Sequence, residues 1–347
     1  MIMLQPSLPQ LRKRYRVRKY NKGLLTVVGV LAVWWTLSGL LGGASRPEFL
    51  HLQQHMNSAA RPDQHLVKKS TFDWSSVSFQ YPPGSLTPLP LSPPYRLPPV
   101  QAPRRIEGLM VLKLREKRRE LVKEVFMADW EAYKKHAWMK DALKPISGSY
   151  RDQFSGWAAT LVDSLDTLWI MGLRKEFDEA VEAVVGIDFG VSGSHHVNTF
   201  ETNIRYLGGL IAAYDLSKRD SLLTKAIELG DLLYAAFNTE NRMPVDFIDF
   251  EQAKTGKGLQ VEPLVVSASP GSLSLEFIRL SQLTGDPKYY DAIARVMNVF
   301  YQGQNRTKIP GLWPTMVSMR RSDVISGNEF TLAGSADSGR LETSCFS

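Results

Sequence analysis

Residues 198–237, "NTFETNIRYLGGLIAAYDLSKRDSLLTKAIELGDLLYAAF", contain two long apolar segments separated by a short polar turn. The first covers residues 200–216, and the second begins after Asp220 with leucine and alanine at helical spacing. Two periodic segments joined by a short connection predict a hairpin of helices. We therefore expect a fold built from helices that pack in pairs.

A similar pattern recurs along the chain: a polar turn, a bulky residue, and then an Ala-Val or Ala-Ile pair. Another apolar segment, residues 272–283, precedes the last copy, whose Asp286-Pro287 start is typical of a helix N-terminus. The spacing is too irregular for tetratricopeptide or armadillo arrays, and no stretch alternates enough to require a large β-sheet. These features predict an all-α fold, an (α/α) barrel formed as a toroid of helical hairpins. The repeated pairs are Ala180-Val181, Ala226-Ile227 and Ala292-Ile293.

Two earlier segments, residues 117–138 and 156–173, are also predicted to be helical. Each carries an apolar stripe of the kind that faces the core, and Pro145 is expected to mark the end of the first helix. The first stripe is Leu121, Val122, Val125, Trp130, Tyr133 and Ala137, and the second is Trp157, Leu161, Leu165, Leu168 and Trp169.

The 347-residue chain has a formal net charge of +7, and the whole excess lies before residue 23. Seven lysines and arginines in residues 12–22 precede any acidic residue, which leaves 42 − 7 = 35 basic residues against 35 acidic ones elsewhere. A neutral body argues against a phosphate-binding surface, so we expect no nucleic-acid partner.

Residues 23–45, "GLLTVVGVLAVWWTLSGLLGGAS", carry no charge and are long enough, at about 1.5 Å per helical residue, to cross a hydrocarbon core. A cleaved signal peptide is the alternative, although its apolar centre usually spans about 7 to 15 residues. The positive-inside rule keeps the basic tail, residues 1–22, in the cytosol and the rest in the lumen. The layout predicts a transmembrane signal anchor, and hence a single-pass type II membrane protein whose body lies in the lumen.

Residues 46–104 separate this anchor from the helices, and residues 81–103 contain nine prolines. Such a run favours polyproline II and cannot build a packed core, so it predicts a luminal stalk. A proline-motif ligand for a partner domain is the alternative.

Two features bear on a luminal location. Cys345 is the single cysteine, so we expect the fold to be held by its core and not by disulfides. Asn305, in the sequon Asn305-Arg306-Thr307, is a candidate glycosylation site.

The helix predicted at residues 200–216 opens with a charged pair, Glu201 and Arg205. In an α-helix this pair shares a side with Gly208, Gly209 and Ala212, and bulky residues populate the other side. A face of small residues lets either a neighbouring helix or a ligand cavity approach the backbone. An inert surface ion pair is the alternative, since such pairs are common and contribute little. The bulky residues are Phe200, Ile204, Leu207, Ile211 and Tyr214.

Longer motifs place this pair in a known context. "SGWAATLVDSLDTLWIMGLRKEFDEAVEAV" (155–184) and "VNTFETNIRYLGGLIAAYDL" (197–216) resemble, in order and spacing, the class I α-mannosidases of glycoside hydrolase family 47. The resemblance also includes "SLEFIRLSQLTGDPKYYDA" (274–292) and "FTLAGSADS" (330–338). It implies that residues 105–338 form part of an α-mannosidase barrel.

The resemblance implies roles for individual residues. Glu201 falls on the family's proton-donating carboxylate, and Arg205 on an arginine of the same pocket, which implies substrate binding. Asp337 falls on a second catalytic acid, whereas Asp163 and Asp166 match acidic positions with a structural or supporting role. The small face of the Glu201 helix is then expected to line a carbohydrate pocket.

The resemblance also implies the chemistry. Hydrolysis of a glycosidic bond needs one carboxyl group to protonate the leaving oxygen and another to activate water or attack. The family implies inversion, a bound Ca²⁺ that touches sugar hydroxyls, and terminal α-1,2-linked mannoses of high-mannose N-glycans as substrate. We expect none of the metal ligands to lie in this chain.

The chain departs from the family pattern at three places. Ser269 stands where many members have an acid, and Ser335 where many have an arginine. Residues 339–347 do not follow the tyrosine-rich helix that continues the family pattern after Ser338. We therefore expect an incomplete barrel, and a chain that alone neither hydrolyses mannosides nor binds Ca²⁺. The alternatives are a non-catalytic, mannose-glycan-binding quality-control protein and a membrane-tethered interaction protein.

Overall fold

The computed structural model describes residues 66–90, 102 and 106–337. The chain divides into two units, Met1–Ser58 and Ala59–Ser347, and every described residue belongs to the second. The predicted cytosolic tail, membrane anchor and off-pattern tail (1–22, 23–45 and 339–347) lie outside the described residues. No helix within the described ranges combines the length and the apolar character that crossing a bilayer requires.

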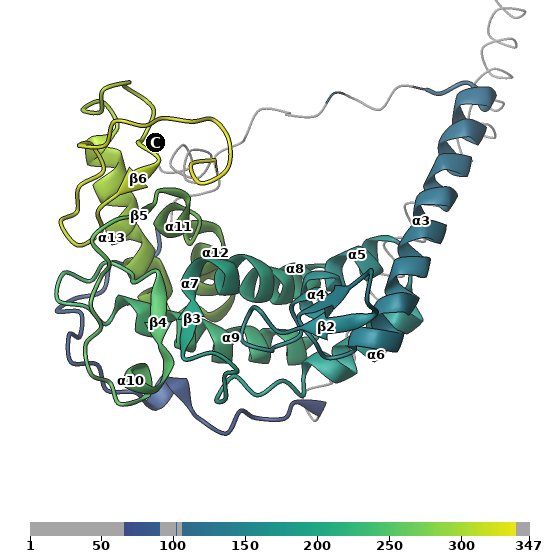
Figure 1. Ribbon diagram of the computed structural model, residues 1–347, viewed down its shortest axis with the longest axis horizontal. Coiled ribbons are helices and arrows are strands. Elements are labelled where there is room, and N and C mark those ends of the chain that lie inside the picture. The colour runs from purple at the N-terminus through teal and green to yellow at the C-terminus, as the bar shows by residue number, and fades with distance from the viewer. Residues whose placement is uncertain (1–65, 91–101, 103–105, 338–347) are drawn as a thin grey trace, which may run out of the picture. The chain divides into compact units, whose positions relative to one another are not determined.

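Helices are the main regular secondary structure of the described residues (Figure 1), as the sequence predicted. The longer ones are α3 (Leu109–Ala137), α6 (Arg174–Val184), α8 (Gly208–Ser217), α9 (Asp220–Tyr234), α12 (Ser274–Thr284) and α13 (Pro287–Gly303). The shorter ones are α4 (Ala159–Asp163), α5 (Leu165–Ile170), α7 (Thr199–Glu201), α10 (Phe250–Lys254) and α11 (Ala268–Gly271). Two 3₁₀ turns, η3 (Trp74–Ser76) and η5 (Ala235–Phe237), and a π-helix, η4 (Thr202–Leu207), complete the helical elements of the described residues.

Three small antiparallel sheets of two strands each accompany these helices. Because each strand has only two or three residues, the described part of the chain contains no large sheet, in keeping with the sequence prediction. The pairs are β1 (Ala142–Lys144) with β2 (Ser149–Arg151), β3 (His196–Asn198) with β4 (Phe247–Asp249), and β5 (Val265–Val266) with β6 (Met316–Val317).

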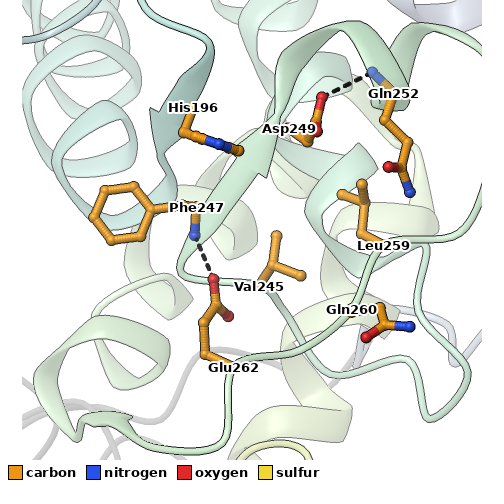
Figure 2. A pocket seen from close by; sticks show the side chains of 8 residues that line it. All are labelled: His196, Val245, Phe247, Asp249, Gln252, Leu259, Gln260 and Glu262. Carbon is orange, nitrogen blue, oxygen red and sulfur yellow. Dashed lines mark hydrogen bonds between the residues drawn. The ribbon is translucent and has the colours of Figure 1, made fainter.

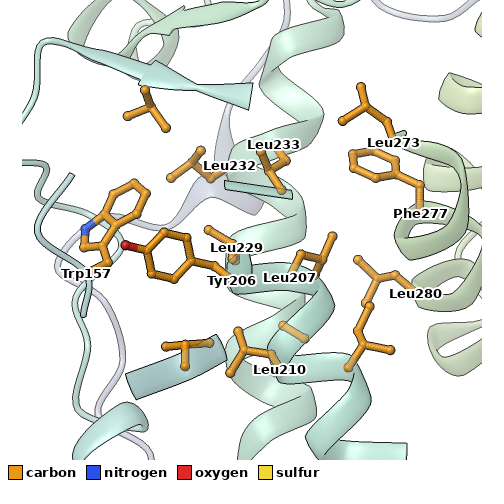
Figure 3. Packing of buried hydrophobic residues seen from close by; sticks show 14 of the residues in the cluster. Trp157, Tyr206, Leu207, Leu210, Leu229, Leu232, Leu233, Leu273, Phe277 and Leu280 are labelled. Carbon is orange, nitrogen blue, oxygen red and sulfur yellow. The ribbon is translucent and has the colours of Figure 1, made fainter. Parts of the chain in front are cut away.

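The predicted helical hairpins are present. α8 packs on α9 and α12 packs on α13, while α8 also contacts α5 on one side and α12 on the other (Figure 1). Asp286 caps α13 by accepting the backbone N–H of Lys288, with Pro287 in the first turn, as its sequence predicted. Figure 3 shows the resulting core, with Trp157 beside Tyr206 and with Leu207 on the side of Phe277.

Helix α3 differs from its prediction in two ways. It ends at Ala137, and Pro145 instead lies in the turn between β1 and β2. Trp130, Tyr133 and Ala137 are buried as expected, because this end of α3 packs on β1 and β2. The earlier part of the stripe was wrongly predicted to face the core, since Leu121, Val122 and Val125 are 48%, 59% and 64% exposed.

The helix predicted at residues 156–173 is divided into α4 and α5 at Ser164. The Ser164 hydroxyl donates to the carbonyl of Thr160 at 2.6 Å, a bond that competes with the regular helical ladder. The core-facing stripe is confirmed despite this break, because Trp157, Leu161, Leu165, Leu168 and Trp169 are all buried.

Residues 66–90, which belong to the predicted stalk, lie against the helices instead of extending as a spacer. Trp74 is buried there, and several backbone and side-chain donors of the segment reach acceptors on the helical unit. A backbone whose donors are satisfied in this way is part of the fold. The contacts are Trp74 Nε1 to the Phe189 carbonyl (2.8 Å), Tyr81 N–H to Asn238 Oδ1 (3.0 Å) and Thr87 N–H to Asp291 Oδ1 (2.9 Å).

Candidate active site

Glu201 lies where strand β3 passes into a helix. Asn198, the last residue of β3, caps this helix because its Oδ1 accepts the backbone N–H of Glu201 at 2.7 Å. Asx followed three residues later by Glu is the capping-box pattern, in which the glutamate usually turns back to the cap. Here the carboxylate accepts a hydrogen bond from Arg205 Nε at 2.7 Å instead. This cap was not predicted, although Asn198-Thr-Phe-Glu201 carries its signal.

The helix after Glu201 is not the regular α-helix that the sequence predicted. Thr202–Leu207 forms a π-helix, an element that occurs mostly as single turns and often at functional sites. Its buried side consists of Thr202, Asn203, Tyr206 and Leu207. Of the bulky residues that the sequence placed on one side, Leu207 and Ile211 are buried, and Phe200, Ile204 and Tyr214 are half-buried. The different hydrogen-bond period rotates the side chains away from their α-helical positions.

Arg205 holds Glu201 and is itself restrained by two further groups. Its Nη1 lies 3.4 Å from Asp163 Oδ2, and its guanidinium lies 4.7 Å from the ring centroid of Phe154. The Glu201 side chain remains 26% exposed, so it is accessible to a ligand. The structure thus brings together Glu201, Arg205 and Asp163.

Burial raises the pKa of Asp163 above its usual range, although Arg205 works in the opposite direction. The neighbouring carboxylates of Asp166 and Glu201 add to this rise. Asp163 therefore responds to the charge of Glu201 and lies in contact with Arg205. The supporting role that the family resemblance implies for Asp163 stays a prediction.

The small residues of the Glu201 helix accommodate protein and not an open cavity. A Cβ at Gly209 would lie 2.8 Å from the carbonyl oxygen of Val162, and one at Gly208 would lie 3.2 Å from Glu276 Oε1. Close packing against α4 and α12 thus explains both glycines. The expectation that Gly208 and Gly209 line a carbohydrate pocket is corrected accordingly.

Two other predicted site residues lie at the surface. Asp337 is exposed in the segment after β6, and none of the hydrogen bonds or ion pairs within residues 66–90 and 106–337 joins it to Glu201. Asn305 is exposed in the turn after α13, so a glycan could be attached there. The catalytic role of Asp337 and the glycosylation of Asn305 remain predictions.

The two departures from the family pattern, Ser269 and Ser335, lie near each other. The Ser335 carbonyl accepts the backbone N–H of Ala268 at 3.1 Å, next to Ser269. The Ser269 hydroxyl in turn donates to the carboxylate of Asp246. Burial raises the pKa of Asp246, an effect that the Ser269 hydrogen bond opposes. At this position the chain therefore carries a serine bound to a buried aspartate.

A pocket of about 540 Å³ lies on the exposed side of the β3–β4 ribbon (Figure 2). His196 and Asp249 are paired across the ribbon and therefore share this side. Glu262 borders the pocket, and its carboxylate accepts the backbone N–H of Phe247 at 3.0 Å. Glu201 does not line this pocket. The cavity and the Glu201–Arg205 pair are therefore separate features.

Within the described ranges, no group of three or more histidine, cysteine, aspartate or glutamate side chains is arranged to hold a metal ion. Calcium prefers six to eight oxygen ligands. The described residues therefore contain no carboxylate cluster of the kind that often holds Ca²⁺.

Comparison with known proteins places the chain among glycosidases. Residues 125–339 match Glycosyl hydrolase family 47. A mannosyl-oligosaccharide 1,2-alpha-mannosidase of Arabidopsis thaliana is 41% identical over 184 residues, which cover 52% of this chain and 32% of the relative. The endoplasmic reticulum mannosyl-oligosaccharide 1,2-alpha-mannosidase of Homo sapiens is 36% identical over 281 residues, 78% of this chain and 38% of the relative. An alpha-1,2-mannosidase structure from Trichoderma reesei gives a TM-score of 0.56 at 31% identity, covering 65% of this chain and 48% of that one.

The helical fold and the Glu201 motif are thus those of a glycosidase. The chain is a member of glycosyl hydrolase family 47, because the family match covers more than half of its 347 residues. The resemblance seen in the sequence motifs is confirmed. The chain spans 32% and 38% of the length of the Arabidopsis and human relatives.

Proposed function

We propose that the protein is a mannosyl-oligosaccharide 1,2-alpha-mannosidase that removes terminal α-1,2-linked mannose from N-glycans by inverting hydrolysis. The observation that carries this proposal is the contact between Glu201 and Arg205, which fixes an accessible carboxylate at the start of a π-helix. The family and the names of its members support the substrate class.

Glu201 acts as the general acid in this proposal. Its Oε2 is held by Arg205, whereas its Oε1 makes no hydrogen bond with the residues that the structure describes. The free oxygen can carry the proton to the leaving glycosidic oxygen. Arg205, which is restrained by Asp163 and Phe154, gives the carboxyl one orientation, and proton transfer depends on such positioning.

Inversion also needs a second carboxylate, about 6.5 to 9.5 Å from the acid, to activate water. Asp337 is the further acid that we propose for the site. Nothing among the described residues holds it at a fixed distance from Glu201. We therefore propose that the 347-residue chain does not turn over substrate by itself.

Calcium dependence is a further part of the proposal. Because the described residues supply no ligand set, no catalytic step is assigned to the ion. Chelation by EDTA should abolish mannose release by the active protein, and added Ca²⁺ should restore it. Release that is unchanged in EDTA would contradict calcium dependence.

We propose a location in the endoplasmic reticulum or Golgi membrane, which the name of the human relative supports. Residues 23–45 serve as a type II anchor in this proposal. Alkaline carbonate should leave the protein in the membrane pellet, and protease added outside sealed microsomes should remove only residues 1–22. Digestion of the body would refute this topology.

Activity is tested on an α-1,2-linked mannose disaccharide. We would compare the 347-residue chain with a fusion in which the remaining C-terminal part of the Arabidopsis relative is joined after residue 338. The fusion is expected to release mannose and the chain alone is not. Release of mannose by the chain alone would contradict the proposal that this chain does not turn over substrate by itself. A fusion that binds the disaccharide without releasing mannose would favour the non-catalytic glycan-binding alternative.

A further inference from the structure

Helix α12 contacts the π-helix through one buried polar pair. Asn203, a fully buried residue of η4, donates from Nδ2 to Glu276 Oε2 at 2.8 Å and to the carbonyl of Ser272 at 3.2 Å. Two more polar atoms at this contact, Asn203 Oδ1 and Ser272 Oγ, are buried and have no partner among the described residues. The contact is therefore polar and incompletely satisfied by protein groups.

The carboxyl group of Glu276 occupies a space that Gly208 leaves open. A Cβ at Gly208 would lie 3.2 Å from Glu276 Oε1, so a larger residue there would displace the carboxyl. Although Glu276 as a whole is half-buried, its carboxyl lies inside the contact, and burial raises its pKa to about 7. The hydrogen bond from Asn203 works against this rise without cancelling it.

No ion pair among the described residues includes Glu276, because the charged side chains of the packed helices have other partners. Arg205 on η4 bonds to Glu201, Asp215 on α8 pairs with Arg279, and Asp231 on α9 pairs with Lys288. On α13, Arg295 pairs with Asp291. An ionised Glu276 is consequently a buried charge that is held only by its own backbone N–H and the Asn203 amide, without a counter-ion. Burying a charge without a counter-charge is costly, so the closed contact favours the neutral carboxyl.

Asn203 lies between the two residues that form the proposed acid–arginine pair. Glu201 ends α7, and Arg205 belongs to the same π-helix as Asn203. Tyr206 fixes the segment from the other side, since its hydroxyl lies 2.9 Å from Asp141 Oδ1. The position of the acid thus depends on side chains that hold the π-helix from two directions.

We propose that Glu276 is a positioning residue that holds the π-helix through Asn203 and keeps Glu201 against Arg205 while its carboxyl is neutral. The role of Glu201 as the acid rests on the proposed function, but the holding of the π-helix does not. Loss of the proton from Glu276 favours opening of this contact.

Linkage gives the sign of the pH effect. The carboxyl has its ordinary pKa of 4.5 when the contact is open and about 7 when it is closed. Between these values the open form loses a proton and the closed form keeps it, so opening rises about tenfold per pH unit. Above pH 7 both forms are ionised and the opening equilibrium levels off.

Hydrogen exchange of the peptide covering residues 200–213 in the 347-residue chain tests this directly. After correction for the intrinsic rate, protection in the wild type should fall between pH 5 and pH 7 and then stay level. Glu276→Gln keeps the shape of the side chain without its titration, so its protection should be independent of pH. Arg279→Gln, on the same helix, should behave as the wild type does.

Two outcomes would overturn the proposal. One is the same pH dependence in the wild type and in Glu276→Gln. The other is a loss of protection at every pH in Glu276→Gln, which would show that the carboxylate is the form that holds the segment. Hydrogen exchange does not depend on turnover, so this result can be interpreted even if the mannosidase proposal fails.

The link to Glu201 has its own readout in the active fusion. Glu276→Gln should remove any decline of kcat that occurs between pH 5 and pH 7 and should leave KM unchanged. If the exchange result holds but the pH profile of kcat does not change, then Glu276 holds the helix without positioning the acid.

Discussion

Two strand-to-helix junctions of the same β-ribbon are built alike and end differently. Asn198 closes β3 and accepts the backbone N–H of Glu201 at 2.7 Å. Asp249 closes the partner strand β4 and accepts the backbone N–H of Gln252 at 3.0 Å. Both are Asx caps with an acid or amide three residues later, so the local sequence rule is the same at both.

The junctions differ in the path of the chain after the cap. Gln252 Nε2 donates to the carbonyl of Gly258 at 2.7 Å and ties down its own loop, after which α10 ends at Lys254. Glu201 leads into a π-helix and finds Arg205. The same capping motif therefore supports a loop at Asp249 and presents an accessible acid after Asn198. The structure that follows the cap determines which of the two results.

The largest expected effect is on stability, when an aromatic residue that packs on one of the two junctions is removed. Trp74 packs edge-on against Phe250 of the second junction, with 5.2 Å between centroids. Trp157 packs on Tyr206 of the first junction at 5.8 Å and also contacts Phe250 at 6.2 Å. Trp74→Ala should lower the free energy of unfolding by about 3 to 5 kcal/mol, measured in urea. Trp74→Phe is the milder control. Equal loosening of both junctions in hydrogen exchange would show that they form one cooperative unit.

The chemical contrast is sharpest when the two side chains are exchanged. Glu201→Gln in the active fusion removes the transferable proton and keeps the shape. We expect kcat to fall about 10²-fold or more with binding of the disaccharide retained. Gln252→Glu, at the matching position of the second junction, should leave turnover near the wild-type value. Normal turnover in Glu201→Gln would exclude it as the acid.

The two caps should contribute equally to stability, but only the cap at Asn198 should affect activity. Asn198→Ala and Asp249→Ala each remove one helix cap, and each should cost about 1 kcal/mol in the free energy of unfolding. Only Asn198→Ala should also lower kcat, because only that cap precedes the acid. Asn198→Asp, which retains a capping oxygen, is the control. An equal loss of kcat in both alanine variants would remove the functional contrast.

The smallest effect concerns Asp163, which has no counterpart at the second junction. Its raised pKa means that the folded state binds the proton more tightly than the unfolded state. Stability should therefore fall as pH rises from the usual value of 3.8 through the raised one. Asp163→Asn should remove this decline of Tm, whereas Asp166→Asn, which takes away one of the smaller causes of the raised pKa, should only reduce it. The effect is small because Asp163 is half exposed.

The helical hairpins and part of the candidate site could be predicted from local sequence. Trp157 and Leu161 were placed in the core because periodicity alone identifies a buried stripe. The same reasoning failed for Val125, because a stripe is buried only where a partner packs on it. The pocket expected at the two glycines of the Glu201 helix came from the family resemblance, because small residues by themselves admit a neighbouring helix as readily as a ligand; the structure places protein atoms there.

The sequence by itself determined features whose partners lie within a few residues: the cap at Asp286, the pairing of α8 with α9, and the Glu201–Arg205 contact. Tertiary structure decided the rest. Asn203 meets Glu276 across 73 positions, and Tyr81 meets Asn238 across 157, so neither the held π-helix nor the docked segment 66–90 leaves a local pattern. The physical reason is that propensity and periodicity act over one or two turns, whereas a buried hydrogen bond between distant segments exists only once the chain has folded.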